Sequence, residues 1–300
     1  MILRFFEQGL RVTVRRLNMR VLETPDLSQT DRCVLVPTMG ALHGGHGSLI
    51  QAAVRRARIE GVPSAVSIFV NPKQFNDPQD FDRYPDRLDD DLEMCRSFGV
   101  DLVLNPPVEE VYPRGFDASE GVPIPQVASE PGLEDRFRPG HFAGVCQVVS
   151  RLFDLCGASA AVFGEKDWQQ LQCVRTMVAM QGRSIEIIPA ETVREPSGLA
   201  MSSRNLNLSE SARGLSVAIS RALAAASSMQ TPASAEAIMG EMLRGAGIEA
   251  EYAVIRPAST LMPIEDPDRV VHEPCRALIA AKVGGVRLID NAPWTPIAYA

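Results

Sequence analysis

The chain contains 300 residues, of which 45% are hydrophobic and 22% charged, a composition typical of globular proteins large enough for two domains. Its formal net charge of -7 argues against a broad nucleic-acid-binding surface, so basic groups for an anionic ligand have to gather inside a cleft. The sequence also lacks the roughly 20 consecutive apolar residues of a membrane span and the apolar core of a signal peptide, so we expect no nucleic-acid partner and no membrane association.

Short apolar runs alternate with amphipathic segments through the first two thirds of the chain. The runs predict strands over residues 33–36, 64–70, 101–104, 160–163 and 185–188, and the amphipathic segments predict helices over about 46–60, 87–98, 141–156 and 167–181. Strands that alternate with helices form right-handed crossovers in a parallel sheet that helices cover on both faces. We therefore predict a Rossmann-like, doubly wound α/β domain over residues 1–192.

The composition changes after about residue 206. Alanine-rich segments predict helices over 209–228 and 233–245, and three apolar runs predict antiparallel strands at 251–257, 275–283 and 286–293. These elements indicate a smaller C-terminal α+β domain over residues 193–300. A hinge near residues 190–195 would let this domain close over the first one like a lid.

Doubly wound sheets bind ligands beyond the carboxyl ends of their strands, at the point where the strand order reverses. The segments that follow the predicted strands are "PTMGALHGGH", "NPKQFN", "NPPVEEVYPRG", "GEKDWQQ" and, after a connector, "REPSGLAMSSRN". Four of these five segments are rich in polar residues and glycine. The sequence thus has its unusual side chains where this fold would bind a ligand.

Two of the chain's four histidines, His43 and His46, flank Gly44 and Gly45 at a predicted helix start. Free backbone N–H groups and the helix dipole favour an anion there, and the spacing puts both rings on one side of the first turn. Both rings could therefore donate hydrogen bonds to one polyphosphate. Two alternatives stay open: a metal site, for which no further ligand pattern lies nearby, and a helix-capping turn with surface histidines.

Two further segments carry groups suited to a nucleotide. In "FGEKDWQQL", Lys166 is a flexible point charge for a phosphate, and Asp167 could bind a ribose hydroxyl or a metal-bound water; the alternative is a charged helix start. In "GLAMSSRN", Ser202, Ser203 and Arg204 could form a phosphate-binding nest with a guanidinium clamp, and the alternative is a plain polar loop.

Two segments carry polar side chains suited to a second substrate. Asn71 and Gln74 follow a predicted strand in "FVNPKQFN" and are neutral hydrogen-bonding groups appropriate to a hydroxylated molecule. Arg138 and His141 surround the Pro-Gly turn of "RFRPGHF", just before a predicted helix. An ordinary surface turn with charged side chains is the alternative for this second segment.

The acidic segment 77–93 contains eight Asp and Glu residues, a density usual for a solvated helix face. Magnesium coordination by Asp89, Asp90 or Asp91 is the alternative. The sequence has no Ser/His/Asp triad order, no Walker-type GxxxxGK[ST] loop and no GxGxxG fingerprint, which argues against triad hydrolysis, P-loop hydrolysis and the usual dinucleotide binding. The chemistry that fits is direct transfer between bound substrates.

The six cysteines are spread irregularly, and no pair has CxxC spacing. They are Cys33, Cys95, Cys146, Cys156, Cys173 and Cys275. This pattern favours reduced, packed thiols over a disulfide framework or a zinc site. We therefore expect a cytoplasmic protein.

Seven segments, taken in order, resemble the pantothenate synthetase (pantoate–β-alanine ligase) family over about residues 15–292. They are "PTMGALHGGHGSL", "FVNPKQF", "YPDRLDDDL", "RPGHFAGV", "FGEKDWQQL", "GLAMSSRN" and "RLIDN". "HGGH" is similar to the HIGH-type signature that nucleotidyltransferases share with class I aminoacyl-tRNA synthetases, and "MSSRN" takes the place of their KMSKS loop. The resemblance implies the Rossmann-like fold of the nucleotidyltransferases with a smaller C-terminal domain.

The resemblance also implies an ATP-dependent ligation in two steps, assisted by Mg2+. The carboxylate of (R)-pantoate attacks the α-phosphorus of ATP and releases pyrophosphate, and the amine of β-alanine then attacks the pantoyl adenylate and releases AMP. A cytoplasmic homodimer in coenzyme A precursor synthesis is the family expectation. Two alternatives are a HIGH-type adenylyltransferase with a phosphate acceptor, which Lys73 would favour, and a non-catalytic nucleotide-binding regulator.

The family's contacts carry over position by position. Its ATP contacts fall on Met39, Gly40, Ala41, Leu42, His43, Gly44, Gly45, His46, Gly164, Glu165, Lys166, Asp167, Val193, Met201, Ser202, Ser203 and Arg204. Its pantoate contacts fall on Gln74 and Gln170, and we assign Asn71, Arg138 and His141 to the same substrate-binding side, for pantoate or β-alanine.

The predicted catalytic groups are His43, His46, Lys166 and Arg204. The family pattern gives His46 the role of proton donor, whereas physical reasoning favours stabilisation of the departing pyrophosphate by both histidines. A helix start lowers the pKa of a histidine and a bound phosphate raises it, so the sequence leaves the protonation state of both rings open.

Four positions depart from the family pattern. Lys73 replaces a usually uncharged residue, Gln147 a common threonine, Arg151 a frequent lysine, and Ser197 the usual aspartate before "GLA". Arginine and lysine present their hydrogen-bond donors differently. We expect these departures to affect rate and affinity rather than the type of reaction.

Overall fold

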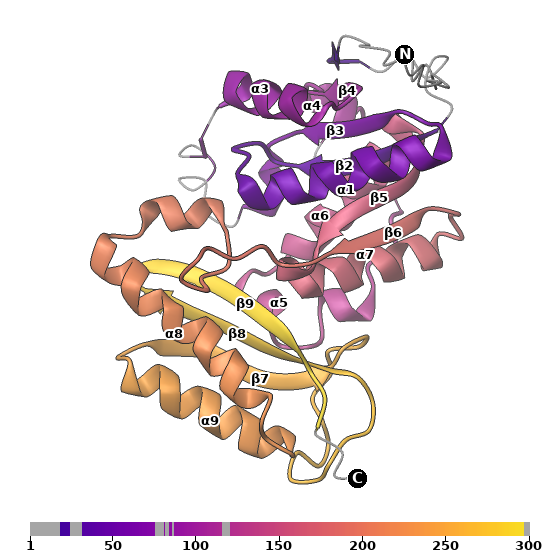
Figure 1. The fold of residues 1–300 in the computed structure, drawn as a ribbon. Helices are drawn as coiled ribbons and strands as arrows, with labels where there is room; N and C mark the ends of the chain where they lie inside the picture. Colours follow the sequence, from indigo (N-terminus) through magenta and orange to yellow (C-terminus); the bar gives the residue numbers. More distant parts are fainter. Residues whose placement is uncertain are drawn as a thin grey trace, which may run out of the picture.

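The structure of the chain is a computed structural model and describes residues 19–24, 32–75, 81, 84–85, 87–115 and 121–296 (Figure 1). Residues 1–18 and 297–300 of the two predicted domains lie outside the described residues, as do positions 76–80, 82–83 and 86 in and before the acidic segment. No helix in the described part of the chain is long and apolar enough to cross a membrane.

A six-stranded parallel sheet forms the upper half of the molecule in Figure 1. In sheet order its strands are β1 (Arg20–Leu22), β4 (Leu102–Leu104), β3 (Ser64–Ile68), β2 (Cys33–Thr38), β5 (Ala158–Gly164) and β6 (Glu186–Ala190). Each neighbouring pair runs parallel. The structure confirms all five predicted strands. It adds β1, whose sequence RVL is largely exposed and so lacks the buried apolar run that predicts β4.

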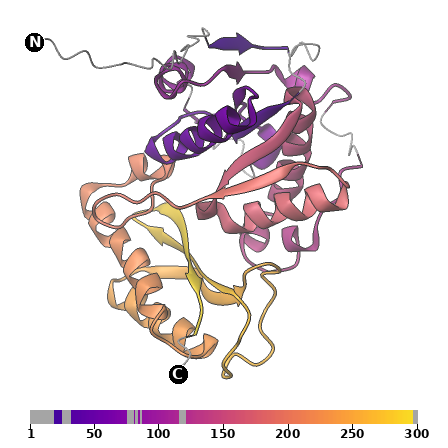
Figure 2. The ribbon, with the colours of Figure 1, turned by 45° about the vertical axis from the view of Figure 1, so that its right-hand side comes forward.

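Helices cover both faces of this sheet (Figures 1 and 2). They are α1 (Gly44–Glu60) and α3 (Leu88–Phe98) on one face and α6 (His141–Cys156) and α7 (Trp168–Met180) on the other. Successive side chains of a strand point to opposite faces, so Val34 and Val36 pack with α1 and α3, whereas Cys33 and Leu35 pack with α6 and α7. The predicted doubly wound architecture is confirmed.

The strand order reverses between β2 and β5. From β2 the chain continues outward to β3 and β4, and from β5 it continues outward on the opposite side to β6. The two strands are parallel neighbours, with Leu35 beside Ala161, so their carboxyl ends open at the same edge of the sheet. The segments that follow them, 39–46 and 165–170, therefore adjoin at the position where this fold class binds ligands.

Short helices fill the remaining connections of the first unit and the start of the second. They are η2 (Pro72–Gln74), α4 (Val108–Val111), η3 (Gln126–Ala128), α5 (Glu134–Phe137), η4 (Glu165–Asp167) and η5 (Ser203–Asn207). Two of them, η2 and η4, directly follow strands at the carboxyl edge of the sheet. These turns, which the periodic pattern did not predict, carry several of the predicted site residues.

The C-terminal part forms a second unit in the lower half of Figure 1. Its antiparallel sheet has the order β7 (Glu249–Pro257), β8 (Cys275–Val283) and β9 (Val286–Trp294), with α8 (Glu210–Ala226) and α9 (Pro232–Gly245) packed against it. Its core contains Trp294, Ile255, Met239 and Ile219. The predicted smaller α+β unit is confirmed, and the boundary between residues 192 and 193 stays a prediction.

A buried ion pair joins the two units. Glu134 of α5 accepts hydrogen bonds from both terminal nitrogens of Arg287 of β9, at 2.8 and 2.6 Å, and one from the hydroxyl of Tyr252 of β7, at 2.8 Å. Arg287 also donates from Nε to Glu251, at 2.7 Å. Burial alone would raise the pKa of Glu134, but the hydrogen bonds and charge of Arg287 outweigh burial and hold that pKa below its ordinary value.

A second contact between the units involves Arg276 of β8. Its guanidinium stacks 3.6 Å from the ring centroid of Trp168 and donates a 2.8 Å hydrogen bond to the carboxylate of Glu165. The indole Nε1 of Trp168 in turn donates to the carbonyl of Ala258, at 2.7 Å. The C-terminal unit therefore contacts the start of α7 through Trp168 and the preceding turn η4 through Glu165.

We expect Glu134→Gln to lower the free energy of unfolding by about 2 kcal/mol at pH 7, the size of a hydrogen-bonded charge contact. The substitution removes one of the two carboxylates that Arg287 contacts and leaves the carboxylate of Glu251. The folded-state pKa of Glu134 is lowered, so its contribution is present above the ordinary value of about 4.3 and is lost as pH falls through the folded value. Urea unfolding at pH 7 and at progressively lower pH measures this difference.

The matched control is Glu265→Gln, because Glu265 is exposed in the connection between β7 and β8. This control should unfold like the parent chain at every pH. A loss in Glu134→Gln that stays the same from pH 7 into the acid range would contradict the assigned role of the ionised carboxylate.

Candidate active site

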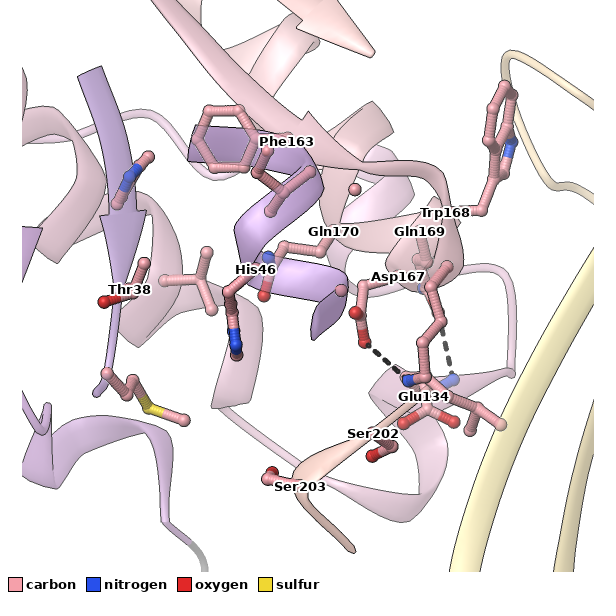
Figure 3. Close-up of a pocket in the computed structure, with 18 of the residues that line it drawn as sticks. Thr38, His46, Glu134, Phe163, Asp167, Trp168, Gln169, Gln170, Ser202 and Ser203 are labelled. Atoms are coloured by element: carbon pink, nitrogen blue, oxygen red, sulfur yellow. Dashed lines mark hydrogen bonds and ion pairs between the residues drawn. The ribbon is translucent and has the colours of Figure 1, made fainter. Parts of the chain in front are cut away.

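A cavity of about 270 Å³ opens at the carboxyl edge of the large sheet, where the C-terminal unit faces it. Its walls come from the ends of β2, β3 and β5, from α6 and η4, from the connector 191–204 and from β9. Figure 3 shows His46, Asp167, Gln170, Ser202 and Ser203 around one shared space. Segments far apart in the sequence thus contribute to a single site.

The turn between β2 and α1 is held by a buried carboxylate. Asp91 of α3 is 2% exposed and accepts hydrogen bonds from the backbone N–H groups of Ala41, at 2.8 Å, and Leu42, at 2.7 Å. The turn has left-handed backbone at Gly40 (φ 80) and Ala41 (φ 51), and a Cβ on Gly40 would lie 2.9 Å from the Asp91 carboxylate. Asp91 therefore shapes the approach to His43.

The three aspartates proposed as magnesium ligands do not line the cavity, although all three are described residues. The oxygens of Asp91 are taken by the turn, and Asp89 and Asp90 are exposed in the first turn of α3. That turn is where acidic side chains stabilise a helix dipole. For Asp89 and Asp90 the structure thus favours a solvated helix face over magnesium coordination. Asp91 is buried instead, and the sequence did not reveal this.

His43 and His46 cap α1 and line the cavity at the same time. Nδ1 of His43 accepts from the N–H of Gly45, at 3.1 Å, and Nδ1 of His46 accepts from the N–H of His43, at 3.2 Å. A neutral imidazole that accepts at Nδ1 carries its proton on Nε2. The histidines therefore form the helix-capping turn that was one alternative, but they line a cavity, and each ring has an Nε2–H donor.

Both rings are neutral near pH 7. Burial, and then the charge of Lys166, lower the pKa of His43, and burial lowers the pKa of His46 to about 3. The ring centroids lie 4.2 Å apart, so two protonated imidazoles side by side would also repel each other. The lowered pKa values and the hydrogen bonds at Nδ1 both favour the neutral form, a question that the sequence left open.

Lys166 and Asp167 lie on η4, beside the histidine pair. Nζ of Lys166 is 3.8 Å from the carboxylate of Asp167, whose side chain is 47% exposed. Burial alone would raise the pKa of Asp167, but Lys166, Arg204 and Arg138 lower it. Asp167 therefore stays an anion among cations, and the group as a whole favours a further negative ligand.

The segment 193–204 brings two hydroxyls and a guanidinium to the opposite wall. An antiparallel bridge pairs Arg194 with Ala200, and the guanidinium of Arg194 donates to the carboxylate of Asp290 of β9, at 2.6 and 3.0 Å. Ser202 then caps η5 by accepting from the N–H of Arg204, at 3.3 Å. The segment is thus a polar loop, as the alternative has it, and Ser202, Ser203 and Arg204 also line the cavity.

Arg138 and His141 meet at the backbone of Gln74. The carbonyl of Gln74 accepts from a terminal nitrogen of Arg138, at 3.2 Å, and lies 3.1 Å from Nδ1 of His141. Burial lowers the pKa of Arg138 to about 10 and that of His141 to about 4, so near pH 7 the first is charged and the second neutral. All three residues line the cavity with Gln170.

Asn71 supports this wall from behind. It is 0% exposed and does not line the cavity; its amide donates to the carbonyl of Gly144, at 3.2 Å, and its oxygen accepts from the hydroxyl of Tyr112, at 2.6 Å. The same oxygen caps η2 by accepting from the N–H of Lys73. The contact of Asn71 with a substrate stays a prediction, and its polar atoms hold the turn that carries Gln74.

Most of the other predicted residues line the cavity. They are Met39, His43, Gly45, His46, Gly164, Lys166, Asp167, Val193, Met201, Ser202, Ser203 and Arg204 on the nucleotide side, and Gln74, Arg138, His141 and Gln170 on the substrate side. Within the described chain, Gly40, Ala41, Leu42, Gly44 and Glu165 do not line it. The first three form the turn on Asp91, and the carboxylate of Glu165 faces Arg276 instead.

Two of the four departures from the family pattern contact each other. Nζ of Lys73 donates to Oε1 of Gln147, at 2.8 Å, and lies 4.9 Å from the ring centroid of Tyr112. Lys73 therefore faces α6 and does not line the cavity. Arg151 donates twice to the carbonyl of Glu110, at 3.0 Å, and Ser197 is exposed in its turn. All four departures are thus outside the cavity lining.

Several lining residues were missed by the sequence reasoning. Glu134 and Tyr252 belong to the contact between the units, and each has its partner more than a hundred positions away, with no local signal. Asn291 lies in the quoted segment "RLIDN", so the motif itself could have indicated it. Its amide donates to the carbonyls of Glu165, at 2.9 Å, and Lys166, at 2.8 Å, and so fixes η4 from the C-terminal unit.

Sequence comparison identifies relatives of this chain. A sequence model of the family described as pantoate-beta-alanine ligase matches residues 12–293. The pantothenate synthetase of Nocardioides sp. is 46% identical over 270 residues, which cover 86% of this chain and 78% of that protein. The pantothenate synthetase of Cereibacter sphaeroides is 44% identical over 286 residues, which cover 94% of this chain and 98% of that protein.

Solved structures give the same result. Pantothenate synthetase from Thermus thermophilus matches with a TM-score of 0.81 and 39% identity, over 93% of this chain and 100% of that chain. Pantoate-beta-alanine ligase from Francisella tularensis, complexed with beta-gamma ATP and beta-alanine, matches with a TM-score of 0.69 and 30% identity, over 91% of this chain and 97% of that chain. The chain therefore belongs to the pantoate–β-alanine ligase family, whose members are ligases that form a C–N bond.

Proposed function

We propose that this protein condenses (R)-pantoate with β-alanine at the expense of ATP, through a pantoyl adenylate, and releases pyrophosphate and AMP. The observation that carries the proposal is the cavity itself, in which the neutral donors His43 and His46 share one space with three cationic side chains and with neutral glutamines. The Francisella tularensis relative, whose complex contains an ATP species and β-alanine, supports these substrates.

The first step needs charge stabilisation more than proton transfer. When the pantoate carboxylate attacks the α-phosphorus, negative charge grows on the nonbridging oxygens and on the departing pyrophosphate. Lys166 and Arg204 supply positive charge, and His43 and His46 supply Nε2–H donors without being acids, since burial lowers the pKa of His46 to about 3. We therefore assign His46 the stabilisation of the leaving pyrophosphate rather than proton donation.

The other end of the cavity suits pantoate. Gln74 and Gln170 offer amide donors and acceptors for its hydroxyl and carboxylate groups, and Phe69, Phe142 and Val145 line the same cavity with apolar surface for its two methyl groups. A phosphate acceptor, which the adenylyltransferase alternative requires, would need cationic groups at this end in addition to Arg138. Lys73, the residue that favoured this alternative, donates to Gln147 and does not line the cavity.

We also propose that Mg2+ assists the first step. The described residues contain no group of three or more His, Cys, Asp or Glu side chains that could hold a metal ion, so the phosphates of ATP would supply most of its ligands. Asp167, the lining carboxylate beside Lys166, is the residue we assign to this ion. When bound, the ion would neutralise phosphate charge.

We further propose a homodimer in the cytoplasm, in which residues 1–192 bind the substrates and residues 193–300 act as a lid. All six cysteines are free and buried, which suits a reducing compartment. The second unit contacts the site directly, through the ion pair of Arg287 with Glu134 and through the stacking of Arg276 on Trp168. Sedimentation analysis of the purified protein would test the dimer.

The main proposal predicts β-alanine-dependent release of AMP from ATP, Mg2+ and pantoate. Purified protein incubated with these three and β-alanine should form AMP and pyrophosphate in equal amounts over many turnovers, and omission of β-alanine should stop turnover after the adenylate forms. Nucleotides separated by chromatography measure the products. AMP release that ignores β-alanine, or a dinucleotide product, would rule out the proposed reaction.

We expect His46→Asn to lower turnover by at least ~100-fold with little change in folding, the scale of a lost transition-state donor. The oxygen of asparagine can accept from the N–H of His43 as Nδ1 does, so the cap of α1 is kept while the Nε2–H is lost. Initial rates and thermal unfolding measure the two effects separately.

His272→Asn is the control for this substitution, because the fourth histidine is exposed and does not line the cavity. Its rate should equal that of the parent chain. Near-normal turnover in His46→Asn would refute the assigned role of the Nε2–H group.

A further inference from the structure

We propose that His141 accepts the proton that the amine of β-alanine loses when the amide bond forms. This inference rests on the proposed function and goes beyond it, because it assigns one histidine to the second half-reaction and leaves His43 and His46 to the first. Three histidines line the cavity, and the backbone atoms that they contact make them chemically different.

The tautomer of His141 is the reverse of the other two. Its Nδ1 lies 3.1 Å from the carbonyl oxygen of Gln74, and a carbonyl can only accept a hydrogen bond, so Nδ1 carries the proton. The lone pair of the neutral ring is therefore on Nε2. In His43 and His46 a backbone N–H takes the lone pair of Nδ1, and Nε2 carries the proton instead.

The lone pair of His141 is available to a ligand. The residue lines the cavity, and within the described part of the chain the hydrogen-bond contact of its ring is the one from Nδ1 to the Gln74 carbonyl. His141 is the first residue of α6, and its burial, followed by the charge of Arg138, disfavours the charged ring. The ring consequently stays neutral near pH 7, with a lone pair on Nε2.

Other basic groups of the described lining are less suited to this role. The carboxylate of Glu134 accepts from Arg287 and Tyr252, and that of Asp290 accepts from Arg194. Asp167 is surrounded by cations, and Glu191 is exposed to water in the connector. His141 thus lies within the cavity, and the lone pair on its Nε2 accepts no hydrogen bond from the described residues.

The chemical step balances with one proton on His141. β-Alanine reacts as its free amine, after one proton has gone to solvent. The nitrogen lone pair forms the C–N bond to the acyl carbon of the pantoyl adenylate, the acyl C–O bond breaks, and its electron pair leaves on the phosphate of AMP. The remaining extra proton passes from nitrogen to Nε2 of His141, and Asp167 and Glu134 stabilise the imidazolium by charge until it releases the proton.

The test separates the two half-reactions in His141→Asn. The amide nitrogen of asparagine can donate to the Gln74 carbonyl as Nδ1 does, but nothing replaces the Nε2 acceptor. Pantoate-dependent exchange of labelled pyrophosphate into ATP reports on the first half-reaction, and single-turnover transfer of the pantoyl group to β-alanine reports on the second.

We expect pantoyl transfer to β-alanine to fall by about 100-fold relative to pyrophosphate exchange, the usual size of a general-base contribution. Hydroxylamine, which is largely unprotonated and strongly nucleophilic at neutral pH, should still trap the adenylate as a hydroxamate at close to the parent rate. The exposed His272→Asn should match the parent chain in all three assays.

Three other outcomes would overturn the inference. Normal transfer to β-alanine in His141→Asn would exclude the proton acceptor, and an equal fall of exchange, transfer and hydroxamate formation would make His141 a structural residue. Rescue of β-alanine transfer by His141→Gln would show that an uncharged acceptor suffices, so no proton is taken. Absence of pantoate-dependent exchange in the parent chain would instead refute the proposed function.

Discussion

The reversal of strand order between β2 and β5 is the constraint on which the site depends. Because these strands are parallel neighbours, the segments after them leave the same edge of the sheet, and residues about 120 positions apart, His46 and Lys166, line one cavity. The connection after β2 has to turn sharply there. The buried carboxylate of Asp91 stabilises that turn through two backbone N–H groups and thereby sets where α1 begins.

Backbone hydrogen bonds also decide what each lining histidine can do. A histidine whose Nδ1 meets an N–H becomes an Nε2 donor, and one whose Nδ1 meets a carbonyl becomes an Nε2 acceptor. His43 and His46 meet N–H groups at the start of α1, whereas His141 meets the carbonyl of Gln74. Burial keeps all three rings neutral near pH 7, so the fold supplies donors and an acceptor from a single residue type.

The C-terminal unit does more than face the cavity, because its β9 strand contacts the catalytic segments directly. Asn291 donates to the carbonyls of Glu165 and Lys166, and Asp290 accepts from Arg194 at the base of the segment that carries Ser202 to Arg204. Both contacts come from neighbouring residues of one strand. Movement of this unit would therefore shift Lys166 and Arg204, on two sides of the cavity, together.

The sequence by itself determined five of the six strands of the parallel sheet and the helices between them, because buried strands read as apolar runs, and it placed the segments that line the cavity after strand ends. It could not distinguish Asn71, which holds a turn, from Gln74, which lines the cavity, because both are polar residues in one short segment. Only the tertiary structure decided the pairing of Glu134 with Arg287, the support from Asp91 and the tautomers of the histidines. Each of these features depends either on a partner distant in the sequence or on backbone geometry. Neither kind of dependence produces a periodic pattern in the sequence.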